Sequence, residues 1–171
     1  MDLDAYWKKI CNLVDTHGWA VQSVFEDVEK GIPSISYTVG LSARGLPEIL
    51  LMGIDPRTAN ILLNAAAEKL IGGEFQAQTG SIVNEVANMP LRVKQLTISQ
   101  FEHFGRMAML HGENFSHAVP SFQLVFPDSM GRFPDDPACD PMMRDIQDID
   151  SMIARDSEPS PAKPYRGPRK H

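Results

Sequence analysis

The sequence has little of what would place the protein in a membrane or in an oxidising compartment. It contains two cysteines, Cys11 and Cys139, and neither belongs to a Cys-x-x-Cys pair or to a metal-ligand spacing. No apolar run approaches the roughly 18 residues that a membrane span needs, and no basic region followed by an apolar one opens the chain. We therefore expect a cytoplasmic protein with reduced thiols, without a signal peptide and without a membrane partner.

Sequence signatures of catalysis are also missing. The chain has no Gly-x-Ser-x-Gly, no Gly-x-Gly-x-x-Gly and no phosphate-binding loop. These absences argue against the common hydrolases, dinucleotide-binding enzymes and nucleotidases. The sequence thus gives no reason to expect an enzyme of these classes.

Basic residues are outnumbered by acidic ones, and the formal net charge is -6. The last stretch, residues 157–171, carries four basic side chains and one acidic one, so the rest of the chain is the more acidic. An acidic body repels phosphate backbones, and we expect no nucleic acid to bind the globular part. The basic stretch could contact an acidic partner, although a solvated end is the simpler interpretation.

Length and composition predict one domain followed by a tail. The 171 residues, of which 43% are hydrophobic, suffice for one sizeable core. Residues 156–171 contain Pro159, Pro161, Pro164 and Pro168 among small and charged side chains. We expect a single domain over residues 1–155 and a disordered, basic, proline-rich tail over 156–171.

Residues 35–71 form the clearest folding unit. Ile35, Tyr37, Val39 and Leu41 alternate with small polar residues, which predicts a strand with these four side chains on one face. Residues 46–54 are a continuous apolar run typical of a strand covered on both faces. Asp55-Pro56 then predicts the start of a helix that ends at Gly72-Gly73.

The other elements follow from the same rules. Apolar residues three and four apart predict a helix over 3–15, and alternation predicts strands over 19–26, 82–87, 91–98 and 121–126. Ser99-Gln100-Phe101-Glu102 fits a capping box and predicts a helix that runs to about residue 110. Asp140-Pro141 predicts one last helix that ends near residue 155.

This order predicts an α+β domain. Short connections favour antiparallel neighbours, so we expect a curved, mainly antiparallel sheet covered by helices. Closure of the sheet into a small split-barrel-like structure is the alternative that the pattern leaves open.

Several short motifs resemble those of a bacterial family known only as domain of unknown function 4262. They occur in one order between His17 and Pro134, and their joint occurrence is more specific than any one of them. The motifs are His17-Gly18-Trp19, Tyr37-Thr38-Val39-Gly40-Leu41, Gly45-Leu46-Pro47-Glu48, Leu62-Leu63-Asn64, Gln123-Leu124-Val125-Phe126-Pro127-Asp128 and Gly131-Arg132-Phe133-Pro134. The resemblance implies one domain and carries no established activity.

Five residues are candidates for ligand binding. Tyr37, Thr38 and Glu48 combine a face of small hydroxyl residues with a carboxylate, which could admit a polar ligand. Asp128 and Arg132 lie on a loop after a strand, where an arginine can clamp a carboxylate or phosphate. Such residues also form hydrogen bonds within the protein, without any ligand. For Tyr37, Thr38 and Glu48 this purely structural role is favoured over ligand binding. For Asp128 and Arg132 it is at least as well supported as ligand binding.

The histidines do not predict a metal site. His103 and His111 are eight residues apart and point in different directions on a helix. His17 fits the end of the first helix, and His117 is the fourth histidine of this set. We expect no bound metal.

Three functions remain open from the sequence. The first is a non-catalytic module that binds a small polar molecule or a partner protein. The second is a flavin-binding oxidoreductase, because the order of elements resembles split-barrel domains that bind flavin mononucleotide, usually as homodimers, although no flavin motif matches. The third is a regulatory protein that acts through its basic tail.

Overall fold

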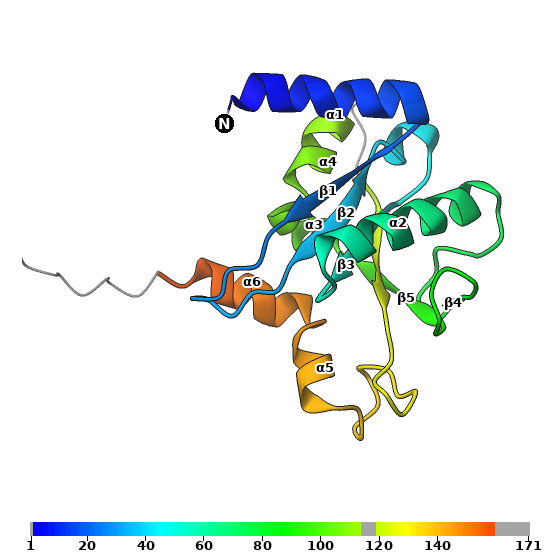
Figure 1. Ribbon diagram of the computed structural model, residues 1–171, viewed down its shortest axis with the longest axis vertical. Helices are drawn as coiled ribbons and strands as arrows, with labels where there is room; N and C mark the ends of the chain where they lie inside the picture. The colour runs from blue at the N-terminus through cyan, green and yellow to red at the C-terminus, as the bar shows by residue number, and fades with distance from the viewer. Residues whose placement is uncertain (1, 114–118, 160–171) are drawn as a thin grey trace, which may run out of the picture.

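The computed structural model describes residues 2–113 and 119–159, which form a six-stranded sheet with helices on both faces (Figure 1). The strands are β1 (Ala20–Val24), β2 (Ile35–Val39), β3 (Glu48–Met52), β4 (Ile82–Val83), β5 (Leu91–Leu96) and β6 (Ser121–Val125). The helices are α1 (Leu3–His17), α2 (Pro56–Ile71), α3 (Ile98–Phe104), α4 (Arg106–Glu113), α5 (Pro141–Asp145) and α6 (Ile149–Ser157). The α+β class is confirmed.

The strands lie in the order β1-β2-β3-β6-β5-β4. All neighbours pair antiparallel except β3 and β6, which run parallel with Glu48 opposite Ser121. The sheet is therefore mainly antiparallel, as expected. Because β1 and β4 are its two edges, it is open, and the split-barrel-like closure does not occur.

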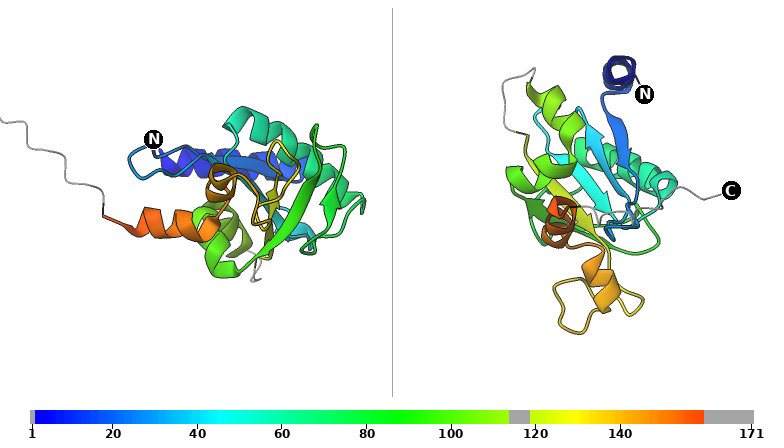
Figure 2. Two further views of the ribbon diagram at one scale, coloured as in Figure 1. Left: turned by 90° about the horizontal axis from the view of Figure 1, so that it is seen from below. Right: turned by 90° about the vertical axis from the view of Figure 1, so that its left-hand side faces the viewer.

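Two hydrophobic cores cover the two faces of the sheet. One core joins the sheet to α1, α3, α4 and α6, and the other joins it to α2 and to side chains of α5. Figure 2 shows α2 on one side of the strands and α3 and α4 on the other. Leu50 and Met52 of β3 belong to the first core, while Ile49 and Leu51 belong to the second. The prediction that this strand is covered on both faces is confirmed.

The predicted unit β2-β3-α2 is present with its local signals. Asp55 caps α2 by accepting the backbone N–H of Thr58 at 3.0 Å, and Pro56 is the first helical residue. One detail was wrong: Leu41 packs in the core with α2, opposite to Ile35, Tyr37 and Val39. Gly40, with a φ of 107°, interrupts the strand geometry, so the alternation of faces does not continue to Leu41.

Three further boundaries differ from the predictions. The capping box is formed by Thr97 and Gln100, so α3 begins two residues earlier, and Gly105 ends it before α4. β4 is shorter than predicted, because the chain turns at Glu85, which has a φ of 62°. The last helix is divided into α5 and α6, since Asp148 caps a new helix by accepting the N–H of Asp150.

The predicted tail lies mostly outside the described residues. α6 extends to Ser157, two residues beyond the expected end of the domain, and residues 160–171 are not described. Of the helices that the structure does describe, none has the length and apolar character needed to cross a bilayer.

Candidate functional site

Thr38 and Glu48 form a closed hydrogen-bonded cluster between β2 and β3. The Thr38 hydroxyl donates to Glu48 Oε2 at 2.6 Å, and its oxygen accepts the N–H of Ile49 at 2.9 Å. The backbone N–H groups of Gly40 and Ser42 donate to Glu48 Oε1 at 2.9 and 3.0 Å. Thr38 and Glu48 are both 0% exposed. Burial raises the pKa of Glu48, and these donors oppose that effect.

Tyr37 is not part of this cluster. Its side chain lies in the core on the opposite face of the sheet, as alternation requires. The ring packs edge-on against Phe101 with centroids 5.9 Å apart, and the hydroxyl oxygen accepts the backbone N–H of Met107 at 3.3 Å. Burial raises the pKa of Tyr37 to about 12. Of the first three candidates, the structure brings together only Thr38 and Glu48.

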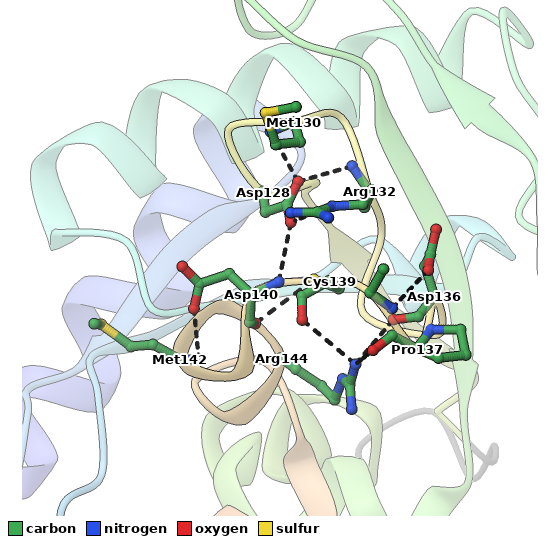
Figure 3. Close-up of polar contacts among 10 residues, drawn as sticks. Asp128, Met130, Arg132, Asp136, Pro137, Cys139, Asp140, Met142 and Arg144 are labelled. Carbon is green, nitrogen blue, oxygen red and sulfur yellow. Dashed lines mark hydrogen bonds and ion pairs between the residues drawn. The ribbon is translucent and has the colours of Figure 1, made fainter.

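Asp128 and Arg132 lie together in the loop that joins β6 to α5 (Figure 3). Asp128 Oδ1 accepts the N–H groups of Met130 and Arg132, each at 2.9 Å. Asp128 Oδ2 accepts Arg132 Nε at 2.9 Å and the N–H of Asp140 at 3.0 Å. One carboxylate therefore closes the turn and fastens it to the residue that caps α5.

These donors keep Asp128 ionised. Asp128 is 5% exposed, and burial alone would raise the pKa of its carboxyl group. The N–H groups of Arg132, Asp140 and Met130 and the Arg132 guanidinium outweigh burial and lower the pKa of Asp128 to about 2. Since Arg132 already binds this carboxylate, the pair shapes the loop, at the end of β6 away from Glu48.

Arg144 secures the other side of the same loop. Its Nη2 donates to the carbonyl oxygens of Asp136 and Pro137, each at 2.9 Å, and to that of Cys139 at 3.4 Å (Figure 3). Its Nε is buried and has no hydrogen-bond partner among the described residues. The hydrogen bonds of this guanidinium within the described chain all come from Nη2, so it keeps N–H donors at Nη1 as well as at Nε that the described protein atoms do not use.

A pocket of about 480 Å³ lies where this loop meets β5, β6 and the turn between α5 and α6. We call it the basic pocket; its charged lining residues are Arg92, Lys94, Asp135, Arg144 and Asp148. Arg92 and Lys94 reach it because Leu91 and Val93, which alternate with them on β5, are buried in the core with α2. Three cations against two carboxylates give this pocket a positive balance in an acidic protein.

The three cations of the basic pocket differ in their partners. Arg92 forms an ion pair with Asp135, which lowers the pKa of that carboxyl, and its guanidinium lies 4.2 Å from the centre of the Phe133 ring. No ion pair to Lys94 occurs within residues 2–113 and 119–159. Lys94 and Arg144 are therefore the cations with binding capacity to spare.

Two buried glutamines adjoin the basic pocket. The Gln147 amide accepts the N–H of Phe126 at 2.8 Å and donates to the carbonyl of Phe126 at 3.0 Å, which joins the turn between α5 and α6 to the end of β6. Gln123 donates to the carbonyl of Gln147 at 2.8 Å. Gln123 Oε1 has no partner among the described residues, and Gln123 lies opposite Lys94 in the pairing of β5 and β6.

The histidines are dispersed. His17 is in the last turn of α1, and His103 Nε2 lies 2.9 Å from an Asp156 oxygen. His111 is buried in α4, and burial lowers its pKa. His117 lies outside the described residues. Within the described chain, no group of three or more His, Cys, Asp or Glu side chains could hold a metal ion.

The sequence missed the basic pocket, although one signal was present. Arg92 and Lys94 alternate with apolar residues in a predicted strand, which already places both cations on one face. Nothing local relates them to Arg144, which is about 50 residues away in the chain. The loop motif around Asp128 was singled out, and it contributes Pro134 to the lining.

Comparisons with known proteins add a family. A family model described as domain of unknown function (DUF4262) matches residues 13–140. No curated protein and no solved structure matches the chain. The matched range includes β1 to β6 and the whole loop around Asp128, and it ends at the residue that caps α5.

Proposed function

The chain belongs to the DUF4262 family, and on this premise we propose that it is a non-catalytic binding module that holds a small anionic molecule in the basic pocket. The observation that carries the proposal is the juxtaposition in one pocket of Lys94 and Arg144, neither of which has an ion pair among the described residues. The Lys94 ammonium and the Arg144 guanidinium suit a ligand with a carboxylate or a phosphate group.

The size and shape of the basic pocket support a small ligand. Its volume of about 480 Å³ lies in the range of roughly 300–1,000 Å³ typical of small-molecule sites. Val125 and Pro134 contribute apolar surface beside the cations.

The composition of the lining favours binding over turnover. No serine, cysteine or histidine lines the basic pocket in the described part of the chain, so it lacks the Ser-His or Cys-His pair of common hydrolases, and its hydroxyl residue Thr79 accepts the backbone N–H of Gln95 at 3.0 Å. Arg92 and Asp135 already neutralise each other at its rim. The proposal therefore includes no reaction, and turnover of any bound compound by the purified protein would contradict it.

The test measures binding of defined anions to the full chain. Calorimetry with phosphate, succinate and flavin mononucleotide would give a dissociation constant for each. Lys94→Met keeps the length of the side chain and removes its charge, and Lys9→Met on the exposed surface of α1 makes the same change in net charge. We expect Lys94→Met to weaken binding about tenfold or more, as for a lost charged hydrogen bond, and Lys9→Met to leave it unchanged.

Two results would overturn the proposal. One is that none of these anions binds at millimolar concentration. The other is that both lysine variants weaken binding equally, because the effect would then reflect net charge and not the basic pocket.

Flavin binding stays a prediction. It was based on a resemblance to split-barrel domains, and the open sheet does not support that resemblance. Flavin mononucleotide carries a phosphate, so its inclusion in the panel tests this alternative at the same site. A protein that binds flavin is yellow, and absorbance of the purified protein is a direct check. Binding of flavin that is insensitive to Lys94→Met would place it elsewhere.

We also propose that this is a bacterial protein of the cytoplasm. Cys11 and Cys139 are both free, which suits a reducing compartment. Burial raises the pKa of each thiol, so neither is primed as a nucleophile. Fractionation of the source cells would test the location.

A further inference from the structure

A second hollow lies between the hairpin that joins β1 to β2 and the helices α3, α4 and α6. Its volume is about 660 Å³, and we call it the acidic groove. Its acidic lining residues are Glu26, Asp27, Glu29 and Asp156, and its cationic or titratable ones are His103 and Arg106. Carboxylates therefore predominate in this groove, in contrast to the basic pocket.

The rim of the acidic groove also exposes apolar side chains. Phe25 is 75% exposed and Val28 is 80% exposed, and both project from the hairpin beside Glu26 and Glu29. Neighbouring exposed apolar side chains with polar residues around them mark surfaces that bind another protein segment or a ligand. The occupant should therefore combine cations with apolar groups.

The described chain ends beside this groove. Lys30 of the hairpin donates to the backbone carbonyl of Asp156 at 2.8 Å and to its carboxylate at 3.1 Å. Arg155 donates to the carbonyl of Gly31 at 2.8 Å. These contacts hold the last turn of α6 against the hairpin, as Figure 1 shows, so residue 160 follows from a fixed point near the groove.

Residues 160–171 have the complementary pattern. Their sequence places Lys163, Arg166 and Arg169 three residues apart, and Pro161 and Pro164 at the same spacing. A polyproline II helix has three residues per turn, so the three cations would form one face and the prolines another, with Tyr165 and Pro168 on the third. Such proline-rich segments bind grooves that present aromatic side chains.

We propose that residues 160–171 occupy the acidic groove of their own chain, with the cationic face toward Glu26 and Glu29 and the apolar faces over Phe25 and Val28. Length permits this, because twelve residues in polyproline II conformation span about 37 Å. Attachment at the rim favours the chain's own segment over a separate peptide, since it gives a high local concentration.

The test is the rate of tryptic cleavage after Arg166 and Arg169 in the native full-length protein. Glu26→Gln with Glu29→Gln removes two exposed carboxylates from the groove, and Asp4→Asn with Glu68→Gln removes two exposed ones elsewhere. We expect cleavage about threefold to tenfold faster in the groove variant. The control variant should match the wild type.

Salt and concentration complete the test. High salt should accelerate cleavage of the wild type, because it screens the attraction between the cations of the segment and the carboxylates of the groove. The groove variant lacks two of these carboxylates, so salt should leave its cleavage rate nearly unchanged. Protection should be the same at low and high protein concentration. Equal cleavage rates in the wild type and the groove variant would overturn the proposal. Protection that vanishes on dilution would overturn it too, since a second copy would then supply the segment.

Discussion

Glu48 offers the sharpest test of how the centre of the sheet is stabilised. Its carboxylate is completely buried and accepts three hydrogen bonds, from the Thr38 hydroxyl and from the N–H groups of Gly40 and Ser42. Glu48→Leu keeps a similar volume and removes every acceptor. The Thr38 hydroxyl can rotate to another partner, but the two N–H groups are fixed.

The cost of Glu48→Leu follows from those two N–H groups. A buried donor without an acceptor costs about 1–3 kcal/mol, and Ser42 is only half-buried, so water can relieve part of its loss. We expect the free energy of unfolding to fall by about 2–5 kcal/mol. That is a large part of the roughly 5–15 kcal/mol by which domains of this size are stable.

Glu48→Gln separates hydrogen bonding from charge. The amide oxygen can still accept both N–H groups, and the amide nitrogen can donate to the Thr38 hydroxyl oxygen. Burial holds the pKa of Glu48 above its ordinary value of 4.5, so the folded protein binds this proton more tightly than the unfolded chain. The stability that protonation contributes is present below pH 4.5 and is lost as the pH rises through the folded pKa. The stability of Glu48→Gln relative to the wild type should therefore increase with pH.

Urea denaturation followed by circular dichroism measures these differences. At pH 7 the glutamine variant should lie within about 1 kcal/mol of the wild type, and the leucine variant well below it, with similar slopes. The account is wrong if Glu48→Leu unfolds at the same urea concentration as the wild type. It is also wrong if the two variants are equally destabilised at pH 7, because loss of charge would then be the cause.

Two further predictions concern the loop after β6 and the end of β2. Hydrogen-bond donors lower the pKa of Asp128 from 3.8 to about 2, so the stability that its carboxylate contributes is present above pH 3.8 and is lost as the pH falls toward 2. Asp128→Asn should reduce this loss of stability in acid, measured by urea titrations at several pH values. An unchanged loss would contradict the assignment to Asp128. Gly40→Ala should cost roughly 1–3 kcal/mol or more, because φ is 107° and the new Cβ would lie 2.6 Å from Val14 Cγ1. Gly45→Ala is its control, with φ of 72° and no atom within 4 Å of the Cβ, and equal costs would show that the contact with Val14 is unimportant.

Elements with strong local signals were predictable. The alternation in β2, the apolar run of β3 and the Asp-Pro start of α2 each depend on residues next to one another in the chain, and all three are in the structure. The errors lie where one local signal competed with another. A serine and a threonine two residues apart each have a capping-box partner three residues later, and the structure uses Thr97 with Gln100.

The candidate site was predictable only in part. Thr38 and Glu48 were expected to lie together, and they do because β2 and β3 pair as neighbours with a short connection. Asp128 and Arg132 are four residues apart, so their ion pair is local. The loop that they shape contributes Pro134 to the basic pocket, whereas neither residue lines it.

The sequence by itself determined most of the elements, their order, the two covered faces of β3 and the family. These features depend on side-chain periods and on capping groups a few residues apart, which act before the chain is folded. Only the tertiary structure decided that Lys94 of β5 and Arg144 of α5 meet at one pocket, and that α6 ends beside the β1–β2 hairpin. The first juxtaposition depends on the position of β6 between β3 and β5, and the second on the bonds of Lys30 and Arg155 between the hairpin and α6. Both are set by contacts between distant segments, which leave no periodic trace in the chain.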